Sequence, residues 1–101
     1  MIRPGQPVPD QIEKLMSLTE TEFHQSLARL GPSRSVGARN FRFAAGSGSV
    51  TVSFEPVAGV TLGGLLALPR ARVVLTFSGA SDAEKGTFLK NFEFTFQRGG
   101  G

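Results

Sequence analysis

The segment from Arg70 to Gly79 constrains the fold of this chain most strongly, because it has the most continuous β-forming character. Within it, Val73, Leu75 and Phe77 lie on one face of an extended strand, and an arginine, a threonine and a serine lie on the other. A proline precedes the segment and a glycine ends it, and neither belongs inside a paired strand. We therefore expect a strand with one buried face, around which the rest of the chain packs.

A β-hairpin is predicted before this strand. Residues 41–45 and 50–55 both alternate apolar and polar side chains, and Gly46-Ser47-Gly48-Ser49 between them is typical turn sequence. The register that brings all the large side chains to one face pairs Ala45 with Val50, Phe43 with Val52 and Phe41 with Phe54.

Later segments predict two more strands and a short helix. Residues 60–68 are expected to form a strand that bends at Gly63-Gly64, and a capping box at Ser81-Asp82-Ala83-Glu84 predicts a helix over residues 82–90. Residues 92–97 place three phenylalanines in strict alternation, which predicts a last strand. Its connection to the strand before it allows either a parallel or an antiparallel pairing.

The N-terminal third predicts helices. Prolines make residues 1–9 an extended, flexible arm, and Asp10 is positioned to cap a short helix over residues 10–17. Thr19-Glu20-Thr21-Glu22 is a second capping box, which predicts a helix that ends at Gly31-Pro32. The pattern leaves open whether the two helices are one bent helix, and residues 32–40 are expected to form a loop.

Together these elements predict an α+β fold in one domain, residues 10–98, followed by a flexible glycine tail, residues 99–101. We expect an N-terminal helix or helix pair packed on a mostly antiparallel sheet of four to five strands, with a short helix before the last strand. One sheet face should be polar and the other buried.

The sequence offers little for catalysis or metal binding. There is no cysteine, His24 is the only histidine, and most carboxylates lie in predicted first helical turns, where the helix dipole favours negative charge. No nucleophile or phosphate-loop motif is present. We therefore expect a protein that is not an enzyme, with no catalytic residue, no metal site, no cofactor and no small-molecule substrate.

The sequence also predicts a cytoplasmic protein without a membrane anchor. No apolar run follows the first residues, as a signal peptide would require, and the absence of cysteine is compatible with a reducing compartment. The longest uncharged apolar stretch, Val57–Leu68, has 12 residues, too few to span a bilayer.

Two sets of residues are candidates for partner binding. The apolar stretch 57–68 contains Leu62, Leu65, Leu66 and Leu68, which form either an exposed patch for association or a buried strand. Arg42 and Arg72 are expected to point from the polar sheet face and Arg70 to lie near a strand end, positions that allow one basic patch in a central region whose net charge is +4. The first set favours binding of another protein or self-association, and the second also allows weak, sequence-independent binding of nucleic acid.

The C-terminal sequence Gln97-Arg98-Gly99-Gly100-Gly101 resembles the Gly-Gly tail of ubiquitin-like proteins and of bacterial sulfur carriers. The resemblance covers four or five residues and implies a carrier whose terminal carboxylate is activated. The leading hypothesis remains a small non-catalytic interaction module, accessory subunit or assembly factor; nucleic-acid binding and the carrier role are its alternatives.

Overall fold

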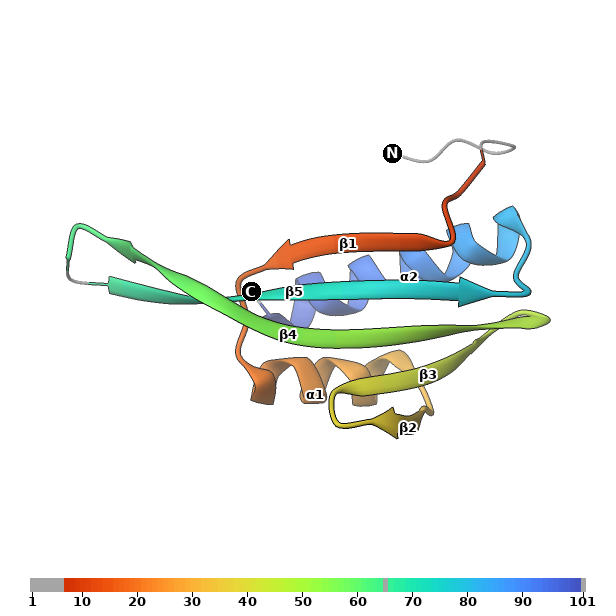
Figure 1. Ribbon diagram of the computed structural model, residues 1–101, viewed down its shortest axis with the longest axis horizontal. Helices are drawn as coiled ribbons and strands as arrows, with labels where there is room; N and C mark the ends of the chain where they lie inside the picture. Colours follow the sequence, from red (N-terminus) through yellow and green to blue (C-terminus); the bar gives the residue numbers. More distant parts are fainter. Residues whose placement is uncertain (1–6, 65, 101) are drawn as a thin grey trace.

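The computed structural model describes residues 7–64 and 66–100, which form one five-stranded antiparallel sheet and two helices. In chain order the elements are β1 (Gln11–Met16), α1 (Glu20–Leu30), β2 (Arg34–Gly37), β3 (Asn40–Ala45), β4 (Gly48–Leu62), β5 (Leu66–Ser78) and α2 (Asp82–Gly100). The sheet order is β1-β5-β4-β3-β2, and both helices pack on the same face of the sheet (Figure 1). The fold is therefore α+β, and no element within residues 7–64 and 66–100 covers the other face of the sheet, here called the uncovered face.

The core lies between the sheet and the helices. The alternation predicted for β5 is confirmed, because Val73, Leu75 and Phe77 are all buried. Aromatic rings from the helices meet rings from the strands, as where the ring centroids of Phe23 and Phe54 lie 4.7 Å apart. The sheet is thus apolar on the face beneath the helices and mostly polar on the other, as the sequence predicts.

The predicted capping box at the start of α1 and the predicted hairpin are confirmed. Thr19 Oγ1 accepts a hydrogen bond from Glu22 N, and Thr19 N donates one to the Glu22 side chain. The hairpin is β3–β4, but its register is shifted by two residues, so that Phe43 pairs with Val50. A shift of two residues keeps every side chain on its predicted face.

The predicted helix over residues 10–17 is wrong, because residues 11–16 form β1, which pairs with β5. Ile12, Leu15 and Met16 fit one face of a helix, but Ile12 and Met16 also fit one face of a strand. The structure uses the second pattern, which leaves Leu15 56% exposed on the uncovered sheet face. The N-terminal helix pair of the predicted fold is therefore a strand followed by one helix.

Two predicted connections also differ. The expected loop over residues 32–40 contains β2, a four-residue edge strand. The expected third strand over residues 60–68 is instead the end of a long hairpin, in which β4 reaches Leu62 and β5 starts at Leu66. Gly63 and Gly64 have positive φ values of 61° and 71°, a conformation that glycine adopts without steric cost and that tight turns require.

The predicted last strand over residues 92–97 is wrong as well. The short helix predicted from Asp82 does not end at residue 90 but continues as α2 to Gly100. Phe88, Phe92 and Phe96 are spaced four residues apart and face the core, whereas Phe94 is 61% exposed. The alternation of phenylalanines therefore contains a helical pattern, with Phe94 on the opposite side. The glycines 99 and 100 lie in α2, and Gly101 is outside the described residues.

A contact between distant parts of the chain fixes the segment before β1. Val8 is buried, and its carbonyl oxygen accepts a hydrogen bond of 2.9 Å from Lys85 Nζ of α2. The same ammonium group lies 2.6 Å from Asp10 Oδ1. These contacts attach the start of β1 to the first turns of α2.

The Glu84 carboxylate predicts a specific pH dependence of stability. It accepts hydrogen bonds from the backbone N–H groups of Ser81 and Ser47, at 2.9 and 2.8 Å, and these lower its pKa from the ordinary value of 4.5. A pKa that is lower in the folded than in the unfolded state stabilises the fold above pH 4.5, and this stabilisation is lost as the pH falls toward the folded pKa. Thermal unfolding between pH 3 and 7 should show a smaller loss of Tm at acidic pH for Glu84→Gln than for the wild type. Equal slopes would contradict this assignment.

Candidate functional site

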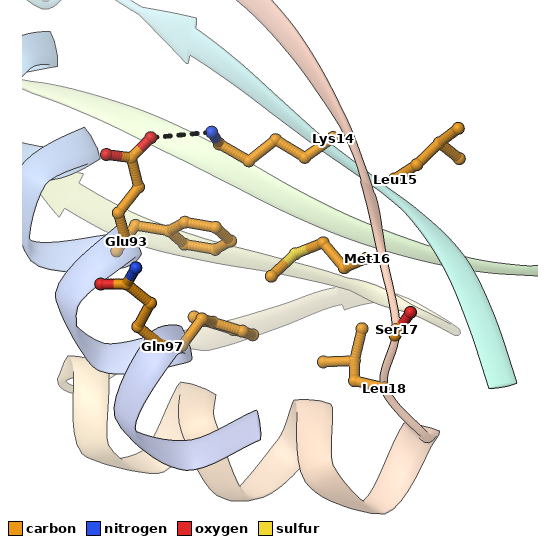
Figure 2. Close-up of a pocket in the computed structure, with 9 residues that line it drawn as sticks. Lys14, Leu15, Met16, Ser17, Leu18, Glu93 and Gln97 are labelled. Carbon is orange, nitrogen blue, oxygen red and sulfur yellow. Dashed lines mark hydrogen bonds and ion pairs between the residues drawn. The ribbon is translucent and has the colours of Figure 1, made fainter. Parts of the chain in front are cut away.

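A groove with a volume of about 690 Å³ lies between β1 and the C-terminal half of α2. One wall is formed by residues 14–18, in β1 and just after it, and the other by Phe92, Glu93, Phe96 and Gln97 of α2. Figure 2 shows the side chains of Lys14, Met16 and Leu18 directed toward α2 and that of Leu15 directed away from it. The groove therefore runs along an edge of the sheet, on the face that carries the helices.

The groove has an apolar interior and a polar rim. Leu18, Phe92 and Phe96 are buried beneath it, and Met16 is half-buried. At the rim, Lys14 Nζ lies 2.9 Å from Glu93 Oε2 (Figure 2), and the Glu93 side chain is 59% exposed whereas that of Lys14 is 26% exposed. An exposed ion pair contributes at most about 1 kcal/mol, so its rearrangement by a ligand costs little. The groove is therefore suited to apolar ligand side chains, because the Lys14 and Glu93 charges at its rim already neutralise each other.

The strand beside this groove, β1, presents backbone groups that no strand of the described residues pairs with. Asp10 O accepts a hydrogen bond of 2.7 Å from Phe77 N of β5. In an antiparallel pair, hydrogen-bonded and non-hydrogen-bonded residue pairs alternate, so the backbone groups of Gln11, Glu13 and Leu15 face away from β5. Within residues 7–64 and 66–100, no strand pairs with this edge. The N–H and C=O groups of these three residues are thus a template for another strand.

The ends of β4 and β5 also have exposed edges, but prolines interrupt them. Residues 56–64 and 66–70 form a two-stranded extension, here called the hairpin arm, that reaches past the other strands (Figure 1). On the edge of β4 that faces β3, Phe54 N donates a hydrogen bond to Arg39 O. Because every second residue of a strand faces the same edge, the next backbone position on this edge is Pro56. On β5, the first position facing outward beyond the end of β1 is Pro69. Proline has no N–H to donate, so both edges of the arm resist strand addition at their base.

The opposite edge of the sheet is a weaker template. β2 has four residues, and its register against β3 is irregular between Ser35 and Gly37. Ser35 Oγ also donates a hydrogen bond to the carbonyl oxygen of Gly37. Short and irregular edge strands are poor sites for pairing with another chain. Of the edges described, β1 offers the longest regular series of free backbone groups, and it is the one that lies along the 690 Å³ groove.

The uncovered sheet face carries the predicted arginines, but they do not form one free basic patch. Arg72 Nε lies 2.8 Å from Glu13 Oε2, and Arg72 Nη1 lies 2.7 Å from Glu55 Oε1. These two carboxylates raise the pKa of the Arg72 guanidinium, through their hydrogen bonds first and their charges second. Arg42 lies on β3 opposite Thr51, well separated in the sheet from Arg70 and Arg72 on β5.

The predicted leucines lie on or near the hairpin arm. Leu62 and Leu66 pair across its end, Leu68 is half-buried on β5, and Leu65 falls outside the described residues. The structure therefore does not bring the leucines and Arg42 into one site. Partner binding through either set stays a prediction.

The described residues were also searched for metal-binding clusters and for membrane-spanning helices. Residues 7–64 and 66–100 contain no cluster of three or more histidines, aspartates or glutamates that could hold a metal ion. No helix in this part of the chain combines the length and apolar character needed to cross a membrane.

Comparison with protein-family models found no match, and searches of curated proteins and of solved structures found none either.

Sequence reasoning missed the groove because both of its walls were assigned to the wrong type of element. The residues of β1 were expected in a helix, and those of α2 from Phe92 onward in a strand. The four-residue spacing of Phe88, Phe92 and Phe96 is the signal that would have identified the second wall.

Proposed function

We propose that this protein is a non-catalytic interaction module that binds an extended segment of another protein as an additional strand beside β1. The observation that carries the proposal is the outward-facing backbone of Gln11, Glu13 and Leu15 along the edge of an apolar groove. Domains that bind peptides by strand addition use main-chain hydrogen bonds for affinity and an adjacent pocket for alternate side chains.

The geometry assigns each side of the added strand a different environment. Side chains opposite Lys14 and Met16 would point toward α2 and enter the groove, because Lys14 and Met16 themselves point that way (Figure 2). Side chains opposite Glu13 and Leu15 would lie on the uncovered sheet face. A suitable ligand therefore carries apolar residues at every second position and contains no proline where the backbone must donate.

Hydrogen exchange in the wild-type protein tests this proposal without any substitution. The probe is a peptide that alternates Val with Gln and is long enough to pair with the six residues of β1. On binding, the amide protons of Gln11, Glu13 and Leu15 should become protected about tenfold or more, whereas those of Lys14 and Met16, already bonded to β5, should change little. Exchange can be followed residue by residue by NMR.

Glu13→Pro should abolish binding of this peptide, because proline removes a donor that faces outward and leaves the β1–β5 bonds in place. Glu13→Gln is the matched control, since it keeps the N–H group, and it should bind the Val–Gln peptide as the wild type does. Uniform protection of β1, equal binding by both variants, or a Kd weaker than about 1 mM would contradict strand addition at this edge.

A further inference from the structure

The cluster of Glu13, Arg72 and Glu55 has one more negative charge than positive charge. Both carboxylates contact the same guanidinium group, at 2.8 and 2.7 Å, and all three side chains lie on the uncovered face of the sheet. Glu13 belongs to the edge strand, and its side chain is 53% exposed. Any strand added to β1 would therefore have a partly unneutralised carboxylate beside it.

Other charged groups are placed too far away, or on the wrong face, to neutralise Glu13, the member of the cluster that lies on the edge strand. Arg42 is on β3, three strand spacings from β1, which corresponds to about 14 Å. Arg70 is two residues from Arg72 on β5 and so lies near the Glu55 end of the cluster, but it is four residues from Val74, the residue opposite Glu13, which corresponds to about 13 Å. Both distances exceed the Debye length of about 8 Å at physiological ionic strength. Lys14 points to the helix side, where Glu93 already pairs with it.

The added strand would place one side chain directly across from Glu13. Residues opposite each other in an antiparallel pair have Cβ atoms about 4.5–5.5 Å apart, and opposite charges there stabilise the pairing. Leu15 is on the same face two residues away and is 56% exposed. The aliphatic part of a lysine or arginine side chain can cover this leucine while its charged end reaches the carboxylate.

We propose that the segment bound at β1 alternates apolar residues, which face the groove, with basic residues, one of which faces Glu13. This inference rests on the proposed function and specifies the chemistry of its partner. This basic ligand is the opposite of what the net charge alone predicts, because a protein with a net charge of +3 would by long-range attraction favour an acidic ligand.

Three peptides of equal length, which alternate Val with Lys, with Gln or with Glu, test the inference. Binding to the wild-type protein is measured by fluorescence or calorimetry at low and at moderate salt. At low salt the Lys peptide should bind about fivefold more tightly than the Gln peptide and at least tenfold more tightly than the Glu peptide. The preference should decrease as salt is added.

Two variants locate the source of this preference. Glu13→Gln should remove most of the preference, so that within this variant the affinities of the Lys, Gln and Glu peptides become similar. Glu55→Gln should also reduce the preference, although Glu55 on β4 is three strand positions away from the ligand. Without the Glu55 carboxylate, Arg72 pairs with Glu13 alone and neutralises it more completely.

The outcomes separate the two proposals. If the Gln peptide binds at β1 but all three affinities are equal, or the Glu peptide binds best, the charge preference is wrong and strand addition stands. A preference for Lys that survives in Glu13→Gln would also overturn the role assigned to the cluster. If none of the peptides protects the β1 amides, both proposals fail.

Discussion

Phe92→Ala should lower the free energy of unfolding by about 3–5 kcal/mol, the largest effect that we expect from a single substitution in this chain. The Phe92 side chain is completely buried, and its ring stacks on that of Phe96 with centroids 4.2 Å apart. Alanine would leave a cavity between α2 and the sheet, which the surrounding rings can fill only in part. For a domain of this size the loss corresponds to a decrease in Tm of about 15–25 °C, measured by thermal or urea unfolding.

Phe94→Ala is the matched control, because it removes the same side chain from the same helix. Phe94 is 61% exposed, so its loss should cost about 1 kcal/mol or less. The comparison also tests the secondary structure, since in a strand Phe92 and Phe94 would share a face and both substitutions would be costly. Similar losses for the two variants would contradict the assignment of residues 92–97 to α2.

Gly48→Ala should lower the free energy of unfolding by about 1–3 kcal/mol, because there is no space for a methyl group. A Cβ atom at Gly48 would lie 2.5 Å from both Ser78 O and Ala80 N, and would also contact Gly79. These are backbone atoms, so the close approach cannot be relieved by a side-chain rotation. The substitution tests whether the β3–β4 turn and the end of β5 are in contact, and chemical denaturation measures it.

Gly86→Ala gives the opposite prediction from the same chemical change. Gly86 lies in α2, and no atom is within 4 Å of a Cβ built there. Alanine has a higher helix propensity than glycine, so this variant should be more stable by about 0.5–1 kcal/mol. A destabilised Gly86→Ala, or an unchanged Gly48→Ala, would be inconsistent with the packing described.

The sequence predicted correctly those parts of the fold in which the pattern of neighbouring residues fits a single type of secondary structure. The Thr19–Glu22 capping box satisfies two backbone groups within the first turn of α1, so no distant contact was needed to predict it. The hairpin over residues 41–55 was predicted for a similar reason, since turn sequence and alternation agree there. Its register was missed by two residues because Val50 and Val52 are equivalent by type and by face.

The errors occurred where one set of residues fits two periods. Ile12, Leu15 and Met16 have helical spacing, and only the unpaired edge of β5 decides in favour of a strand. Phe92 and Phe96 are separated by four residues, which suits both a helix and a strand. Because these ambiguous segments form the two walls of the groove, the candidate site could not be predicted from the sequence.

The two walls of the groove come from segments that are far apart in the sequence, residues 14–18 and residues 92–97. β1 pairs with residues 71–76 of β5, and residues 92–97 of α2 complete the groove. During synthesis the β1 segment therefore remains without its partner strand until β5 has left the ribosome. Contacts of large sequence separation line the groove, so binding of the proposed strand would require β1, β5 and α2 to have assembled.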